Sequence, residues 1–248
     1  MTNSAVAGQL DRPYSVPRHV SVEEGYARWA RTYDETPNPL LALEQRCLLP
    51  LLPCITGKRV LDLACGTGRW LEQLSALGPS LGIGIDLSAA MLAVAREKDA
   101  IAGRLAKADC RTLPFGNSTF NLAVCSFALE HIANLGELAL EWSRVLQQPA
   151  DLYVTELHPR AYAAGWRTGF RDQQGAMQIN AAPHSATEMI TAFSGAGFEL
   201  LGVLECFVGE PERPLFARTG KERSFDAVCV VPAILMLHFR RHSSAAEN

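Results

Sequence analysis

The sequence predicts an α/β protein with a single doubly wound, mostly parallel sheet of seven strands and helices on both faces. Short aliphatic runs alternate with amphipathic helical segments from residue 59 onward, a pattern typical of parallel strands joined by crossover helices. In addition, 48% of the 248 residues are hydrophobic, enough for a sizeable core. We therefore expect one domain over residues 21–248, although the length alone would also suit two small domains.

The N-terminal part precedes this alternation. Residues 1–20 contain few large aliphatics and are expected to form a mobile tail. Tyr26, Trp29 and Tyr33 then recur at i, i+3 and i+7, which places three aromatic rings on one face of a helix. A second amphipathic helix is predicted to follow, and we expect the two helices, at about residues 21–53, to form a lid.

The alternating region supplies the sheet and its helices. The predicted strands are residues 59–64, 81–86, 104–109, 121–127, 151–157, 198–208 and 232–239. Helices are predicted at 69–77, after Ser88, after Asn134 and at 185–197, because Ser and Asn are favoured N-caps. Residues 158–185 are left as a loop long enough to have its own function.

Composition narrows the classes of partner. The formal net charge is −3 and no segment is strongly basic, which argues against nucleic acid as a ligand. No stretch is apolar and long enough to predict a membrane span or a signal peptide. The seven cysteines form no pair or cluster at metal-binding spacing, so we predict no metal site and a reducing compartment. A cytoplasmic protein is the simplest expectation.

The stretch "LDLACGTGRW", residues 61–70, predicts a strand, a glycine turn and the start of a helix. Such turns present backbone N–H groups to nucleotide-like ligands. A dinucleotide fingerprint would need a third glycine where Leu71 stands, which disfavours NAD or FAD without excluding them. A P-loop is excluded more firmly, because no Gly-Lys-Ser/Thr follows the turn.

Two acids at strand ends point to an adenosine. Asp86 ends the second predicted strand, where a carboxylate can accept both hydroxyls of a ribose. Asp109 ends the third strand, where it could accept from an adenine amine while the backbone N–H of Cys110 donates to a ring nitrogen. The ligand predicted by this set carries free ribose hydroxyls and no phosphate that needs neutralising.

Four motifs in order carry a family resemblance: "VLDLACGTGRW", "GIGIDLSAAMLAVAR", "KADCRTLPFGNSTFNLAVCSFALEHI" and "EWSRVLQQPADLYVTELHP". Over roughly residues 25–205 the chain resembles class I S-adenosylmethionine-dependent methyltransferases of the small-molecule type, close to the group of ubiquinone/menaquinone and malonyl-carrier-protein methyltransferases. The resemblance implies a Rossmann-like methyltransferase fold. It also implies S-adenosylmethionine as cofactor, S-adenosylhomocysteine as product and a small-molecule acceptor.

The resemblance implies a cofactor role for one set of residues. The methionine part would be surrounded by Asp62, Ala64, Gly66 and Gly68, with Cys65 and Thr67 in the same turn. The ribose would be bound by Asp86, the adenine face by Leu87 and Met91, and the adenine edge by Asp109 and Cys110. Near the sulfonium would lie Ser126 and Phe127, and Tyr33 would cover the cofactor.

Methyl transfer from a sulfonium needs a positioned acceptor, exclusion of water and, for some acceptors, a base. His131 is the first candidate base because it follows the fourth strand, and its alternative role is to enclose the cofactor. His158, at the end of the fifth strand, is the second candidate and is expected to face the same crevice. Glu130 and Glu156 are candidates for orienting these histidines.

In the loop 158–185, Tyr162, Trp166 and Phe170 are candidates for an acceptor pocket, with Arg167 or Arg171 facing an anionic group. The alternative is that these aromatic side chains pack the loop onto the sheet. Two other functions stay open: a nicotinamide-dependent oxidoreductase, and a non-catalytic S-adenosylmethionine-binding protein. The sequence leaves undetermined the acceptor, the methylated atom and the oligomeric state.

Overall fold

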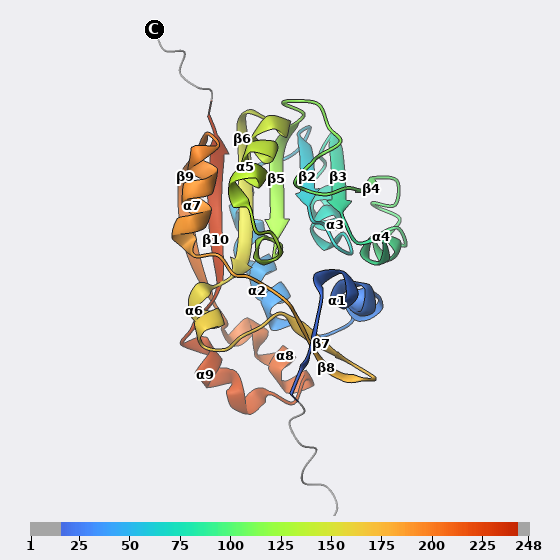
Figure 1. Cartoon of the computed structure of the whole chain (residues 1–248), viewed down its shortest axis with the longest axis vertical. Coiled ribbons are helices and arrows are strands. Elements are labelled where there is room, and N and C mark those ends of the chain that lie inside the picture. The colour runs from blue at the N-terminus through green and yellow to red at the C-terminus, as the bar shows by residue number, and fades with distance from the viewer. Residues whose placement is uncertain (1–15, 243–248) are drawn as a thin grey trace, which may run out of the picture.

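The main sheet has seven strands in the order β4-β3-β2-β5-β6-β10-β9, and the computed structural model that contains it describes residues 16–242 (Figure 1). The strand bounds are β2 Arg59–Leu63, β3 Leu81–Asp86, β4 Leu105–Lys107, β5 Phe120–Ser126, β6 Leu146–Leu157, β9 Phe198–Phe207 and β10 Pro232–Arg241. Strands β4, β3, β2, β5 and β6 are parallel neighbours, and β10 runs antiparallel to both β6 and β9. The predicted mostly parallel α/β fold is confirmed.

Helices cover both faces of this sheet. The helix bounds are α1 Val22–Trp29, α2 Pro39–Leu48, α3 Arg69–Ala76, α4 Ala89–Ala95, α5 Leu135–Val145, α6 Pro159–Ala163, α7 Ala186–Gly195, α8 Arg213–Arg218 and α9 Phe225–Cys229. Helices α5 and α7 pack on one face through Trp142 and Phe193, both fully buried. Helices α2 and α3 pack on the other through Leu43 and Trp70. Each such side chain contributes roughly 1.5–3 kcal/mol by leaving water.

Local signals set most of the helix starts. Ser88 accepts the Met91 N–H at 3.3 Å, and Asn134 accepts the Glu137 N–H at 3.2 Å, so both predicted N-caps are confirmed. Ser185 caps α7 in the same way. Strand β6 is longer than predicted because it begins at Leu146, directly after α5.

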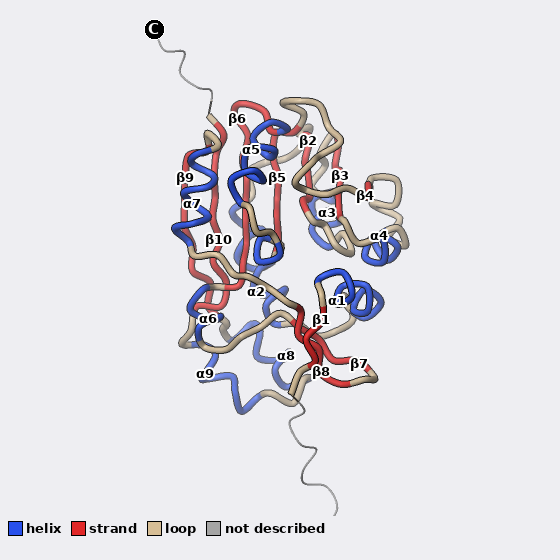
Figure 2. The backbone as a smooth tube through the Cα atoms, viewed as in Figure 1, coloured by secondary structure: helices blue, strands red, loops and turns tan. Residues whose placement is uncertain are grey.

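A second, three-stranded sheet was not predicted. It has the order β1-β8-β7, with bounds β1 Arg18–Val20, β8 Gly175–Ile179 and β7 Gly169–Asp172 (Figure 2). The prediction of a mobile tail is therefore wrong for residues 18–20, while residues 1–15 lie outside the described part. The predicted loop 158–185 is also wrong in part, since it contains α6 and the β7–β8 hairpin. Strands of three to five residues are too short to show a clear alternation of polar and apolar residues in the sequence. These strands form where their side chains pack against α1.

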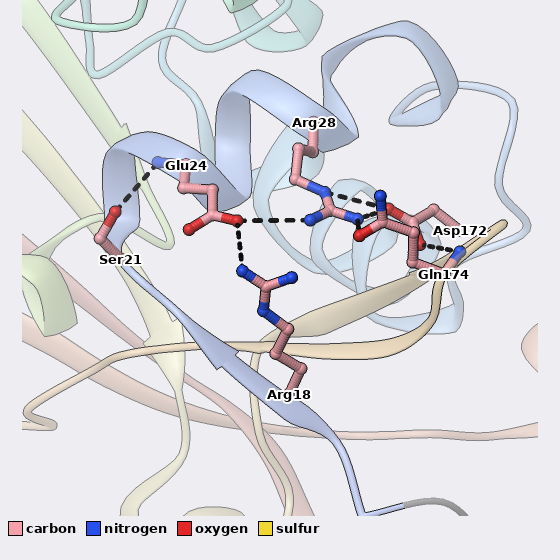
Figure 3. Close-up of polar contacts among 6 residues, drawn as sticks. All are labelled: Arg18, Ser21, Glu24, Arg28, Asp172 and Gln174. Carbon is pink, nitrogen blue, oxygen red and sulfur yellow. Dashed lines mark hydrogen bonds and ion pairs between the residues drawn. The ribbon is translucent and has the colours of Figure 1, made fainter.

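Polar contacts join α1 to this small sheet (Figure 3). The Arg28 guanidinium donates from Nε to Asp172 Oδ2 at 3.1 Å and from Nη2 to Gln174 at 2.9 Å. Glu24 accepts from Arg28 at 3.3 Å and from Arg18 at 3.5 Å. Helix α1 and the hairpin therefore form one unit, which lies beyond the carboxyl ends of β2, β3 and β5 (Figure 1).

Two segments complete the description. Between β9 and β10, helices α8 and α9 occupy a stretch for which no element was predicted, and they pack through Phe216 and Phe225, whose ring centroids are 5.3 Å apart. Within residues 16–242, no helix is both long and apolar enough to span a membrane.

Candidate active site

A cavity of about 760 Å³ lies between the carboxyl ends of the parallel strands and helix α1. It is lined by most of the predicted cofactor residues and by the first candidate base: Tyr33, Asp62, Ala64, Cys65, Gly66, Thr67, Asp86, Leu87, Met91, Asp109, Cys110, Ser126, Phe127 and His131. Parallel strands bring their carboxyl ends to one edge, which is why residues far apart in the sequence meet here.

The glycine turn follows β2 and adopts left-handed backbone conformations. Ala64 has φ 54°, Gly66 φ 54° and Gly68 φ 76°. The Cys65 N–H donates to the Ile85 carbonyl at 2.8 Å, which ties the turn to the neighbouring strand. Gly68 does not line the cavity. A Cβ at Gly68 would lie 2.3 Å from Ile101 Cδ1, so this glycine is required for the packing behind the turn.

Three carboxylates meet the cavity from successive strands. Asp62 accepts the Leu71 N–H at 2.8 Å, and burial raises its pKa to about 7. Asp86 accepts the N–H groups of Gly66 at 2.8 Å and Ser88 at 2.7 Å, while burial raises its pKa. These bonds hold Asp86 at the entrance of α4 and fix the direction of its carboxylate.

Asp109 differs from the other two acids because it is more exposed. The Arg111 guanidinium donates to it at 2.6 Å and lowers its pKa. The backbone of Cys110 is fixed from behind, since its carbonyl accepts the Trp142 Nε1–H at 3.0 Å. Asp109 and Cys110 therefore form one rim of the cavity.

The segment after β5 carries His131 into the cavity. The Glu156 carboxyl oxygen Oε1 accepts the N–H groups of Ala128 at 2.9 Å and Leu129 at 2.6 Å, which fixes the turn before His131. The role expected for Glu156, orienting a histidine, is thus replaced by holding backbone. His131 Nε2 lies 2.9 Å from the Tyr26 hydroxyl, and burial lowers the histidine pKa to about 4.

The N-terminal helices close the cavity from the opposite side. Tyr33 packs edge-on against Trp29 with ring centroids 4.7 Å apart, and burial raises its pKa to about 12. Thr67 donates to Asp34 at 2.8 Å, and Asp34 also pairs with Lys98 at 2.9 Å. These contacts attach the predicted lid directly to the glycine turn.

Beneath the turn lies a buried ion pair. Glu44 of α2 is fully buried and accepts from both Arg69 and Thr155. Arg69 also donates to Ser126 Oγ at 3.2 Å, and its Nη1 is buried without a partner among residues 16–242.

The lining residues fit S-adenosylmethionine. Asp62 and Asp86 offer carboxylates to an ammonium and to ribose hydroxyls, and the unpartnered Arg69 Nη1 offers a cation to a carboxylate. Leu87 and Met91 supply apolar surface for a base.

Comparison with known proteins agrees with this geometry. A family model described as a methyltransferase domain matches residues 60–149. An uncharacterised methyltransferase of Emericella nidulans is 30% identical over 223 residues, covering 74% of this chain and 77% of that protein. The chain belongs to the class I S-adenosylmethionine-dependent methyltransferases. The cofactor of this family is S-adenosylmethionine, and the alternative of a nicotinamide-dependent oxidoreductase is therefore not supported.

Other relatives of this methyltransferase are also informative. A demethylmenaquinone methyltransferase of Tropheryma whipplei is 30% identical over 152 residues, which cover 58% of this chain and 62% of that enzyme. The chain thus spans less than two thirds of that relative's length. The crystal structure of an S-adenosylmethionine-dependent methyltransferase from Mesorhizobium loti aligns with a TM-score of 0.64 and 22% identity, covering 82% of this chain and all of that one, which supports the fold.

The second candidate base does not lie at the cavity. His158 Nδ1 accepts the Arg160 N–H at 3.0 Å, so the side chain caps α6, and its Nε2 is 3.0 Å from Glu205. The expectation that His158 faces the same crevice is wrong, because the chain turns into α6 at once and both ring nitrogens are used there.

The predicted acceptor residues also lie away from the lining. Phe170 stacks on Trp29 with centroids 5.2 Å apart and so belongs to the hydrophobic cluster between α1 and the small sheet. The Arg167 guanidinium lies 3.8 Å from the ring centroid of Tyr162 and donates to the carbonyls of Tyr162 and Trp166, both at 2.6 Å. The alternative interpretation, in which these side chains pack the loop onto the sheet, holds for Trp166, which packs against the core cluster beside the main sheet, whereas Phe170 packs on α1.

Tyr26 and Arg69 are two of the lining residues that were not predicted from the sequence as site residues. Tyr26 was identified only as part of an aromatic stripe, and Arg69 only as the first residue of a helix. The position of Arg69 directly after the glycine turn was the available signal. For Tyr26 the sequence held no such signal, because the partner His131 is 105 residues away.

Proposed function

We propose that this methyltransferase transfers the methyl group of S-adenosylmethionine to a small-molecule acceptor in the cavity beneath α1. The observation that carries the proposal is the convergence of Asp62, Asp86 and Asp109, from three neighbouring strand ends, in one cavity with His131. The sulfonium supplies an electrophilic methyl group when the cofactor is bound.

Each acid has a distinct proposed role. Asp62 holds the ammonium of the methionine part, and Asp86 accepts from the ribose hydroxyls while Gly66 and Ser88 fix its direction. Asp109 and the Cys110 backbone form hydrogen bonds with the edge of the adenine. Gly68 supports the turn without contacting the ligand.

His131 is the proposed base on which the proton lost by the acceptor ends. With a pKa of about 4 it is neutral near pH 7, which is the form that a base requires. Tyr33 covers the cofactor and excludes water, together with Trp29 behind it. Transfer is in line, so the acceptor atom lies opposite the sulfur across the methyl group. We place the acceptor on the side of the cavity formed by α1, where Tyr26 and His131 line it.

The acceptor is proposed to be a metabolite rather than nucleic acid, in keeping with the net charge of −3. All seven cysteines are free, which favours a reducing compartment such as the cytoplasm.

The test is incubation of the protein with a metabolite extract and methyl-labelled S-adenosylmethionine, followed by mass spectrometry. We expect one metabolite to gain a labelled methyl group in a reaction that Asp86→Asn and His131→Gln suppress. Calorimetry with S-adenosylmethionine separates the remaining alternative: cofactor binding with no labelled product would indicate a non-catalytic binding protein. Binding of NAD(P) with no binding of S-adenosylmethionine would refute the proposal.

A further inference from the structure

On the side of the cavity formed by α1, His131 belongs to a connected set of buried side chains. The Tyr26 hydroxyl lies 2.9 Å from His131 Nε2, and both residues line the cavity. Behind them, Glu130 Oε1 is 3.7 Å from the same nitrogen and accepts from Thr168 Oγ1 at 2.5 Å. The side chains of His131 and Glu130 are only 9% and 3% exposed, so their charges are poorly screened by water.

The protonation states of this set follow from burial. Desolvation raises the pKa of Tyr26 well above its usual value and lowers that of His131 to about 4. Near pH 7 the phenol therefore keeps its proton and the imidazole is neutral. When the phenol O–H donates to Nε2, the imidazole proton is on Nδ1, which has no hydrogen-bond partner among residues 16–242, and the lone pairs of the phenol oxygen remain available to the cavity.

A second carboxyl group, that of Glu156, lies near Glu130. Glu130 and Glu156 line a small internal cavity of about 10 Å³, near the space that one water molecule needs. Burial, and next the charge of Glu130, raise the pKa of Glu156 to about 8, so Glu156 keeps its proton near pH 7. Burial also raises the pKa of Glu130, but Thr168 and the charge of Arg167 oppose that shift. Of the two carboxyl groups, Glu130 is the one beside His131, with Oε1 3.7 Å from Nε2, where it is placed to balance a positive charge that forms on the imidazole.

We propose that Tyr26 is the residue that takes the proton of the acceptor, with His131 as its base and Glu130 as the counter-charge. This inference rests on the proposed function and adds the route of the proton. As the O–H or N–H bond of the acceptor breaks, an electron pair of the acceptor oxygen or nitrogen forms the bond to the methyl carbon. The electron pair of the sulfur–methyl bond leaves with sulfur. The acceptor's proton passes to the Tyr26 oxygen while the phenol proton passes to His131 Nε2.

The route has two consequences for this chain. The positive charge at the end of transfer lies on His131, where Glu130 stabilises it. The acceptor class is one that loses a proton on methylation, a hydroxyl or a neutral N–H, and not a thioether. Because Tyr26 belongs to α1, the route is complete only when α1 is docked over the strand ends.

The first test is nitrogen-15 NMR of the histidine side chains in the full chain. We expect His131 to be neutral and protonated at Nδ1 from pH 6 to 8, and Tyr26→Phe to shift its Nε2 resonance and raise its pKa. The control is Tyr153→Phe, which removes another buried hydroxyl, one that donates to the Leu51 carbonyl at 3.0 Å outside the cavity. A His131 protonated at Nε2, or one that Tyr26→Phe leaves unchanged, overturns the assignment.

The second test uses the metabolite extract and labelled cofactor. Tyr26→Phe should lower the initial rate of methyl incorporation about 10²-fold at pH 7, the usual effect of losing a proton-transfer group, while S-adenosylmethionine binding by calorimetry is retained. Glu130→Gln should lower the rate in the same direction, and Tyr153→Phe should not. Wild-type rates of methyl incorporation in both Tyr26→Phe and Glu130→Gln contradict the proposal. An inactive wild-type protein contradicts the proposed function instead, and the NMR result still decides on the pair.

Discussion

The buried ion pair between Glu44 and Arg69 leads to a quantitative prediction for Glu44→Gln. Glu44 is fully buried and the Arg69 side chain is 18% exposed, so removal of the carboxylate leaves a guanidinium with little access to water. Breaking a buried pair by removing one partner costs roughly 3–5 kcal/mol. In a chain of this size each kcal/mol lowers Tm by about 2–4 °C, so we expect Tm to fall by about 6–20 °C.

The measurement is thermal and urea unfolding followed by circular dichroism. Glu210→Gln, which breaks an exposed pair with Arg213, is the matched control and should cost less than about 1 kcal/mol. Replacing both buried partners, as Glu44→Leu with Arg69→Met, should recover much of the loss, because no unpaired charge then remains. The reasoning is refuted if Glu44→Gln unfolds within 1 kcal/mol of the wild type.

Three further predictions concern the cavity. Gly68→Ala should destabilise the protein by at least about 1 kcal/mol in urea unfolding, because its φ of 76° and the contact with Ile101 both oppose a Cβ; an unchanged midpoint would contradict this. Burial raises the pKa of Asp62 to about 7 in the folded protein. The unfolded state, in which this pKa is lower, therefore binds fewer protons between about pH 4 and 7, and the free energy of unfolding should fall as pH rises through that range. Binding of cationic S-adenosylmethionine near pH 7 should then release protons from Asp62, seen by calorimetry in buffers of different ionisation enthalpy, and Asp62→Asn should remove both effects. Tyr33→Ala should weaken S-adenosylmethionine binding more than it lowers Tm, and equal binding would exclude a covering role.

Much of the main sheet and of the cofactor side of the cavity follows from local signals. The glycine turn after β2 and the acids Asp86 and Asp109 lie at the ends of predicted strands, and parallel strands must bring those ends to one edge. Knowing the order of strands along the chain was therefore enough to expect these residues together. The N-caps at Ser88 and Asn134 are likewise local, since each involves only the next three residues.

The residues on the acceptor side of the cavity could not be predicted from such local signals. His158 follows a strand end as His131 follows another, but α6 begins at once and takes the His158 ring as its cap. The aromatic side chains of residues 158–185 were equally suited to a pocket or to packing, and packing against Trp29 decided the position of Phe170.

The sequence by itself determined the fold class, the gathering of the glycine turn with Asp86 and Asp109 at one edge of the sheet, and the helix caps, because these depend on periodicity and on neighbours along the chain. The tertiary structure alone decided the small sheet of β1, β8 and β7, the burial of Glu44 against Arg69 and the meeting of Tyr26 with His131. The pairing of β1 with β8 and the two side-chain pairs join residues 25 to more than 150 positions apart, and their energy comes from desolvation and packing that exist only once the chain has folded.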